Sequence, residues 1–423
     1  MKVLHTADWH IGQVLYQNYD RTDEHEFFFN QLENWCRDHQ PDALIISGDI
    51  FDIQQPSAAV KRFYNDHLVR IVKQNPALRV VVTAGNHDSA SRLAADKSLW
   101  ESIGCNVVAI PPTAELTTQA DWQADFVVEL ESGFIIALPH MNGNRHELTQ
   151  SILNYVASKN SANKPVVMMA HTAISNANAE GHSEIGKMAT QPIEEWGIGY
   201  DYLALGHIHK PQTLGYGDEN QEESTYPAGI ARYSGSALHV SCDEKYPHTV
   251  SLVELNEHGG EIKIKKLRIN ELRHFYELPE NGEAAKNAEE ALTSVADFCK
   301  KHKSGYIRLH ISYSATMPAD FDQQVYAILE PYNNEIRYNP KIIWSDVPST
   351  ATQKEKVVFQ VAELQEMKDP MEFIEKTKDL YPDLDLEDVR AAFDEVAEEV
   401  QRMEEEEEEG KNKKVKKEIV MEL

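Results

Sequence analysis

The chain has 423 residues, of which 41% are hydrophobic and 26% are charged, and its formal net charge is −28. This length is sufficient for two or three domains with hydrophobic cores, and no apolar run approaches the roughly 20 residues that a membrane-spanning helix needs. The negative charge excludes tight non-specific binding to nucleic-acid phosphates by the chain alone, because that affinity comes from Lys and Arg. The four cysteines are scattered and no secretory segment is visible, so we expect a cytoplasmic protein.

The first half of the chain alternates short apolar runs with amphipathic patterns, which is typical of α/β organisation. Strands are predicted over residues 2–7, 42–47, 79–83, 106–109, 165–170 and 201–205, with a hairpin over 125–138. Helices are predicted over residues 22–39, 57–74, 92–102 and 146–158. The polar stretch 172–200 is expected to form a long loop over a site. Alternating strands over 249–255 and 261–269 then indicate one mixed sheet, or two mixed β-sheets flanked by helices.

Near residue 270 the pattern changes, and we expect four segments. They are a large first domain (1–270), a small α+β domain (271–345), a C-terminal helical region (346–403) and a charged disordered tail (404–423). In the helical region, apolar residues at steps of three and four form one stripe: Leu386, Val389, Phe393, Val396 and Val400. This stripe is a candidate surface for a partner protein, and packing against the first domain is the alternative.

Polar side chains with metal-binding chemistry follow five of the predicted strands. They are Asp8 and His10; Asp49; Asn86, His87 and Asp88; His171; and His207 and His209. Each motif alone has a simpler explanation, such as a hydrogen-bonded strand end or the turn that Gly-Asn favours. The seven potential ligands taken together exceed what one ion usually takes from a protein: Asp8, His10, Asp49, Asn86, His171, His207 and His209. We therefore predict two ions about 3.5–4 Å apart that share a carboxylate, with oxygen and nitrogen ligands suited to Mn, Fe, Zn or Mg.

The order and approximate spacing of these motifs resemble the calcineurin-type metallophosphoesterase signature. The matching motifs are Asp8-x-His10, Gly48-Asp49-x-x-Asp52, Gly85-Asn86-His87-Asp88, His171 and Gly206-His207-x-His209. Further features are similar to the bacterial SbcD nuclease subunits: His10-Ile11-Gly12 with Leu15, Arg21 and Glu24, and Tyr233-Ser234-Gly235-Ser236. The resemblance implies a calcineurin-like metallophosphoesterase fold for the first domain, a DNA-contacting capping domain after it, and then partner-binding helices.

Roles for individual residues also follow from this resemblance. It implies that one ion is held by Asp8, His10, Asp49 and His209, and the other by Asp49, Asn86, His171 and His207. It implies that His87 contacts the scissile phosphate and assists the leaving oxygen, with support from Asp88. Asp52 stands where archaeal relatives have a second catalytic histidine, so Asp52 is a candidate catalytic residue. The implied cofactors are two divalent ions, Mn in the first place.

The resemblance implies the nuclease subunit of a DNA end-processing complex. The implied activities are double-strand 3′–5′ exonuclease and single-strand or hairpin endonuclease, in DNA repair, replication and recombination. The implied partners are an SbcC-type coiled-coil ATPase, DNA and a second copy of the chain in a heterotetramer, with no membrane. Two alternatives remain: a stand-alone metallophosphoesterase acting on small nucleotides or phosphoproteins, and a scaffold whose metals are structural or lost.

Overall fold

The computed structural model describes residues 1–345 except for 17–18, 114, 142–144, 181–189 and 218–220. Residues 1–345 form one compact unit. The helical region predicted over 346–403, including its apolar stripe, and the tail predicted over 404–423 lie outside the described residues. Within the part that is described, no helix has the length and apolar character to cross a membrane.

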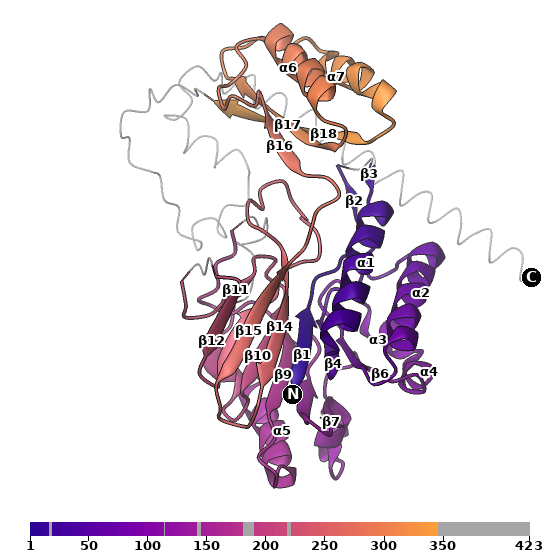
Figure 1. Cartoon of the computed structure of the whole chain (residues 1–423), viewed down its shortest axis with the longest axis vertical. Coiled ribbons are helices and arrows are strands. Elements are labelled where there is room, and N and C mark those ends of the chain that lie inside the picture. The colour runs from indigo at the N-terminus through magenta and orange to yellow at the C-terminus, as the bar shows by residue number, and fades with distance from the viewer. Residues whose placement is uncertain (17–18, 114, 142–144, 181–189, 218–220, 346–423) are drawn as a thin grey trace, which may run out of the picture. The chain divides into compact units, whose positions relative to one another are not determined.

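Two mixed β-sheets form the body of the molecule (Figure 1). Among the described residues, the larger sheet has seven strands in the order β12-β15-β14-β1-β4-β5-β6. They are β1 (Lys2–Thr6), β4 (Ala43–Ser47), β5 (Arg79–Thr83), β6 (Cys105–Val108), β12 (Glu223–Tyr226), β14 (Thr249–Leu255) and β15 (Ile262–Arg268). Strands β1, β4, β5 and β6 run parallel, and β14 joins β1 in the antiparallel sense.

The second sheet has six strands within the described ranges, in the order β11-β13-β10-β9-β8-β7. They are β7 (Val127–Leu130), β8 (Gly133–Ala137), β9 (Val166–His171), β10 (Tyr202–Gly206), β11 (Gln212–Thr213) and β13 (Ile230–Tyr233). The predicted hairpin is confirmed as β7 and β8, which pair antiparallel. Strands β8, β9, β10 and β13 are parallel neighbours.

Successive residues of the central strands pack on opposite faces of the larger sheet. Val3 and Ile45 belong to the core between the two sheets, whereas Leu4 and Ile46 belong to the core that includes the first two long helices. Both faces of β1 and β4 are therefore buried, which explains why these strands are continuous apolar runs in the sequence.

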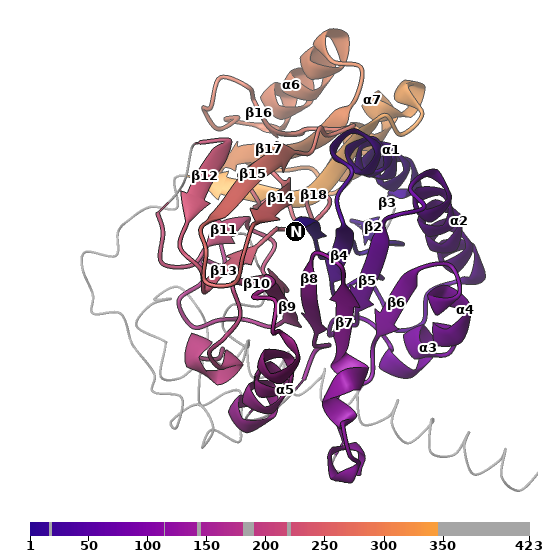
Figure 2. The same cartoon turned by 60° about the horizontal axis from the view of Figure 1, so that its bottom comes forward.

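Helices cover the outer faces of the two sheets (Figure 2). They are α1 (Thr22–His39), α2 (Ala58–Gln74), α3 (Ala90–Ala94), α4 (Lys97–Glu101) and α5 (His146–Lys159), with short 3-10 helices at Leu116–Thr118, Trp122–Phe126 and Ile193–Trp196. The prediction of a single helix over 92–102 is wrong, because two short helices, α3 and α4, occupy this stretch. Asp96 leaves the helical conformation and begins α4, so that Trp100 is buried beside Tyr64.

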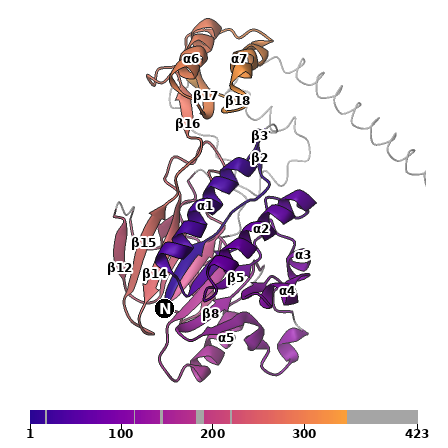
Figure 3. The same ribbon diagram turned by 45° about the vertical axis from the view of Figure 1, so that its right-hand side comes forward.

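The segment from residue 275 to 345 has a hydrophobic core of its own and is called the C-terminal lobe below. It consists of β16 (Phe275–Leu278), α6 (Ala288–Lys301), β17 (Gly305–Ser312), α7 (Phe321–Leu329), a 3-10 turn (Glu330–Tyr332) and β18 (Ile336–Ser345). Its three strands are all parallel. A small hairpin of β2 (Val14–Leu15) and β3 (Tyr19–Asp20) packs beneath the lobe through a shared cluster of Leu15, Tyr19 and Tyr306 (Figure 3).

Candidate metal centre

The predicted ligands gather where strands of both sheets end. Three groups of side chains place their ligand atoms within 4.8 Å of one another. The groups are Asp8, His10 and His209; His10, Asp49 and His87; and Asp49, His171 and His207. The groups adjoin one another because Asp49 and His10 each belong to two of them. The structure thus brings together residues that are up to about 200 positions apart in the chain.

The first group surrounds His10, which is buried. Among the described residues, neither ring nitrogen of His10 has a hydrogen-bond partner, although Asp52 Oδ1 lies 3.5 Å from Nδ1 and Asp49 Oδ2 lies 3.9 Å from Nε2. The ring of His209 lies edge-on to it, with 5.2 Å between the ring centroids. A buried polar atom without a partner is costly, and a divalent cation bound by His10 and the neighbouring carboxylates would remove that cost. These residues therefore fit a metal ion.

The third group is organised by His171, which is fully buried at the end of β9. Its Nδ1 lies 2.8 Å from the main-chain oxygen of Ser47, which fixes that nitrogen as the donor. Its Nε2 then lies 2.9 Å from Asn86 Oδ1 and 3.3 Å from Asp49 Oδ2. The His207 ring lies next to His171, with 5.1 Å between the ring centroids. An imidazole nitrogen, an amide oxygen and a carboxylate oxygen thus converge on one point.

Four of the predicted ligands have left-handed backbone conformations: Asp8 (φ 52°), His10 (φ 46°), Asp49 (φ 50°) and His207 (φ 99°). The chain is therefore not extended over 8–10 and 207–209, as a regular strand end would be. The amides of Asp8 and His10 donate to the main-chain oxygens of Gly48 and Asp49, respectively. The amide of His207 donates to the Asp8 carboxylate. These hydrogen bonds hold the turns in place. Each such conformation costs about 1–3 kcal/mol and is found most often at functional sites.

Glycines allow the two sheets to approach each other at the centre. A Cβ atom at Gly206, on β10, would lie 1.9 Å from the main-chain oxygen of Ser47, on β4. A Cβ atom at Gly48, where φ is +84°, would lie 2.2 Å from His171 Nδ1. A side chain at either of these two glycines would therefore collide with neighbouring atoms. At Gly48 it would also have to adopt a left-handed backbone conformation, which glycine adopts without strain.

The charges of the centre depend strongly on burial. Burial raises the pKa of Asp8 to about 7. Burial by itself lowers the pKa of His171, but the charges of Asp49 and Asp8 raise it to about 9. Burial also favours the neutral form of Asp49, yet His171 and His10 hold the pKa of that carboxyl below its usual range. Protons on Asp8 and His171 therefore compete with any metal ion for the same atoms.

His87 and Asp88 lie at the centre, but their interaction differs from the prediction. The Asp88 carboxylate accepts hydrogen bonds from the amides of Ile50, Phe51 and Gly85. The imidazole of His87 is held instead by the main-chain oxygen of Asp52, which lies 2.8 Å from Nδ1. The expected support of the His87 ring by Asp88 is corrected accordingly, because three backbone amides occupy that carboxylate. Asp52 contributes its carbonyl to His87 and directs its carboxylate toward His10.

Two residues without a predicted role border the centre. Glu244 is 3% exposed, and its Oε1 lies 2.9 Å from Nδ1 of His209. Its other oxygen accepts a hydrogen bond from the Val240 amide. His140 lies beside His171, whose main-chain oxygen is 3.1 Å from the His140 Nδ1. Glu244 stands 35 residues from His209 in an irregular loop, so no periodicity or motif in the sequence indicates this contact.

Comparisons with known proteins show which families and relatives the chain resembles. A family model described as calcineurin-like phosphoesterase matches residues 1–211. The chain is 30% identical over 283 residues to the SbcD subunit of the nuclease SbcCD from Rhodobacter capsulatus, with 60% of this chain and 66% of that protein covered. It is 30% identical to the protein of the same name from Escherichia coli K12 (59% and 65% covered) and 27% identical to that from Bacillus subtilis 168 (60% and 66% covered). The chain thus covers slightly less than two thirds of the length of each of these relatives.

Proposed function

We propose that this chain, whose residues 1–211 belong to the calcineurin-like phosphoesterase family, is a metal-dependent nuclease that hydrolyses DNA phosphodiester bonds. The observation that carries the proposal is the set of adjoining ligand groups that share Asp49 and His10. Similarity to relatives named as nuclease subunits supports a nucleic acid, which we propose is DNA, rather than another phosphoester as the substrate.

The proposed metal ligation follows the two sides of the centre. Asp8, His10, Asp49 and His209 would hold one ion. The second would be held by Asp49, Asn86, His171 and His207. Mn is the first choice of metal, and Mg, Fe or Zn have compatible ligand chemistry. When bound, two such ions supply positive charge for the phosphoryl oxygens and lower the pKa of a water molecule.

His87 is the proposed acid for the leaving oxygen. It lies in the group with His10 and Asp49, and the carbonyl of Asp52 fixes the orientation of its ring. Burial alone would lower the pKa of His87, but the charge of Asp49 and the Asp52 carbonyl raise it above its ordinary value. The raised pKa favours the protonated ring, which can donate its proton to a departing sugar oxygen. Asp88 would act by holding the backbone at Gly85, Ile50 and Phe51.

The wider assembly is also proposed from the relatives. Their names describe them as one component of a nuclease called SbcCD, so we propose a coiled-coil ATPase of the SbcC type as the partner. A second copy of this chain, a heterotetramer and a cytoplasmic setting complete the proposal. Double-strand 3′–5′ exonuclease and single-strand or hairpin endonuclease activities, in repair, replication and recombination, are proposed on the same basis. Residues 271–345, which include the C-terminal lobe, are proposed as the DNA-contacting capping domain.

The decisive experiment compares substrates. Mn-loaded protein, with and without the ATPase partner, is assayed on linear duplex DNA, a cyclic nucleotide and a phosphoserine peptide. We expect the DNA to be degraded and the small substrates to react at least about 100-fold more slowly. Faster turnover of the cyclic nucleotide or the peptide would instead establish the stand-alone phosphoesterase. A protein that binds two Mn ions and hydrolyses none of the three substrates would establish a scaffold.

A further inference from the structure

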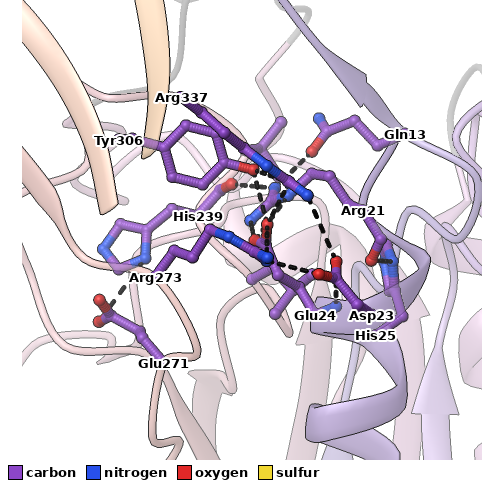
Figure 4. Close-up of polar contacts among 12 residues, drawn as sticks. Gln13, Arg21, Asp23, Glu24, His25, His239, Glu271, Arg273, Tyr306 and Arg337 are labelled. Atoms are coloured by element: carbon purple, nitrogen blue, oxygen red, sulfur yellow. Dashed lines mark hydrogen bonds and ion pairs between the residues drawn. The ribbon is translucent and has the colours of Figure 1, made fainter. Parts of the chain in front are cut away.

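Arg21 and Glu24, at the beginning of α1, are motif residues that belong to none of the three ligand groups. Both are buried, with 2% and 3% of their surface exposed. Figure 4 shows that they meet residues of the C-terminal lobe in one polar cluster. We propose that Glu24 is a positioning residue that couples the lobe to the ligand loop, defined as residues 8–13. The inference rests on the proposed function in one respect, namely that this loop binds metal through Asp8 and His10.

The two carboxylate oxygens of Glu24 face different parts of the molecule. Oε2 accepts hydrogen bonds from Nε and Nη2 of Arg21, at 3.0 and 2.6 Å. Oε1 accepts from the hydroxyl of Tyr306 at 2.6 Å and from Nη1 of Arg337 at 2.7 Å. Tyr306 lies on β17 and Arg337 on β18. A single carboxylate therefore joins α1 to the lobe.

Arg21 extends this connection to the ligand loop. Its Nη1 donates to Gln13 Oε1 at 2.7 Å and also to the main-chain oxygen of His239. On the same turn of α1, His25 places its Nδ1 3.0 Å from the Arg21 carbonyl and its Nε2 2.8 Å from the carbonyl of Trp9. Trp9 stands between the predicted ligands Asp8 and His10. The side chains around Arg21 therefore hold the loop at both of its ends.

Two further arginines, Arg273 and Arg337, pair with acids around the Glu24 carboxylate and anchor the lobe there. Arg273 Nη1 lies 2.7 Å from Asp23 and 3.4 Å from Glu24, and its Nη2 lies 2.9 Å from Glu335. Arg337 also lies 3.6 Å from Asp23. Arg273 and Arg337 are nearly fully buried, and buried guanidinium groups require compensating carboxylates. Among the residues that the structure describes, Glu24 is the one acid of the cluster that contacts all three arginines.

A glutamine at position 24 cannot replace this arrangement. Its side chain has one acceptor oxygen, and its amide nitrogen would face guanidinium groups that are themselves donors only. Glu24→Gln can therefore satisfy Arg21 or the lobe, but not both. Tyr306→Phe is a milder change, since it removes the hydroxyl that donates to Glu24 Oε1 and accepts from Arg337 Nη1 but leaves the charges in place. Tyr338→Phe is its matched control, because the Tyr338 hydroxyl donates to Asp322 within the lobe.

Hydrogen exchange measured by mass spectrometry on the full chain without metal tests the coupling. We expect Tyr306→Phe and Glu24→Gln to accelerate exchange both in β17 and in the ligand loop, by about 5-fold or more. Tyr338→Phe should affect peptides of the lobe alone. If Tyr306→Phe and Glu24→Gln accelerate exchange in β17 and leave residues 8–13 at the wild-type rate, the coupling does not exist.

Added MnCl2 gives the reciprocal measurement, because coupling between two sites acts in both directions. In the wild-type chain Mn should slow exchange in the ligand loop and in β17, and in Glu24→Gln the effect on β17 should be lost. Equal slowing of β17 in the two proteins would overturn the inference. If Mn binds to neither protein, the proposal of a metal centre is wrong. The hydrogen-exchange comparison without metal then still tests whether Glu24 couples the lobe to the ligand loop.

Discussion

His10 shows at the scale of one residue why the centre is suited to a cation. Its ring is buried and both of its nitrogens lack hydrogen-bond partners in the described part of the chain, while Asp49 and Asp52 place carboxylate oxygens 3.5–3.9 Å away. A neutral protein interior offers no stable arrangement of this kind, because unpaired polar atoms and adjacent carboxylates are both unfavourable there. This residue is therefore suited to an external ligand.

His87 is predicted to act on the substrate without holding the ions. His87→Ala should keep the Mn content of the wild type and lower the rate of duplex hydrolysis by about 10²–10⁴-fold, the usual range for a lost general acid. Metal analysis and a DNA degradation assay measure the two quantities. His146→Ala, at the exposed beginning of α5, is the control and should retain activity. A His87→Ala protein with normal nuclease activity would remove this residue from the mechanism.

Glu244 is predicted to orient a metal ligand. Glu244→Gln keeps the shape of the side chain but removes the charge that fixes Nδ1 of His209, so we expect Mn affinity to fall by about 10–100-fold. Isothermal titration calorimetry provides the measurement. Glu280→Gln, whose carboxylate pairs with Lys301 and His302 in the lobe, serves as the control. Unchanged Mn affinity in Glu244→Gln would show that the contact only supports the loop.

Metal affinity is predicted to rise with pH. The pKa of His171 is raised to about 9 and that of Asp8 to about 7, so both groups carry protons over part of the range from pH 6 to 9. Binding of Mn must displace those protons, and each displaced proton strengthens the affinity by up to about tenfold per pH unit. Titration calorimetry in two buffers with different ionisation enthalpies counts the protons released. An affinity that stays constant from pH 6 to 9 would contradict this assignment.

At the scale of elements, the centre depends on the close approach of β4 and β10. The two strands belong to different sheets, and Gly206 permits main-chain atoms of one to lie against the other. The short turns after the strands then direct the ligands into the space between the sheets. A regular strand end could not do this, which is why Asp8, His10 and His207 have left-handed conformations.

Gly206→Ala is predicted to disturb both the packing and the centre. The added methyl group meets the main-chain oxygen of Ser47 and side chains at the centre, so β4 and β10 must separate, at a cost of about 1–3 kcal/mol in unfolding free energy. Loss of Mn binding should accompany the loss of stability. Chemical denaturation and metal titration measure the two effects. Gly217→Ala is the control, because its Cβ would meet no atom of the described residues within 4 Å. Wild-type Mn binding in Gly206→Ala would show that the centre tolerates a wider spacing.

At the scale of the whole molecule, net charge conflicts with the proposed substrate. The chain carries a formal charge of −28, and phosphate binding relies on Lys and Arg. The three arginines around Glu24 cannot contribute, because they are buried and paired with acids. We therefore propose that the positive charge for DNA binding comes from the metal ions and from the proposed ATPase partner.

The metal-free chain is predicted to have a low affinity for DNA because of its net negative charge. The metal-free chain alone should bind duplex DNA more weakly than about 10 μM at physiological salt, within the range of non-specific binding. Addition of the ATPase partner should strengthen binding by orders of magnitude. Fluorescence anisotropy with a labelled duplex measures both states. Tight binding by the metal-free chain alone would mean that a basic surface exists despite the overall charge.

The sequence by itself determined the α/β class, most strand positions and a set of seven candidate metal ligands, because buried parallel strands are apolar runs and their carboxyl ends expose polar residues. It also determined the limits of α1, whose amphipathic pattern is regular over 22–39. Tertiary structure alone decided the hydrogen-bond partner of His87, the contact of Glu244 with His209 and the bridging position of Glu24. These contacts join segments that are distant in the chain, and each depends on which atoms the packed strands and loops bring within hydrogen-bond distance.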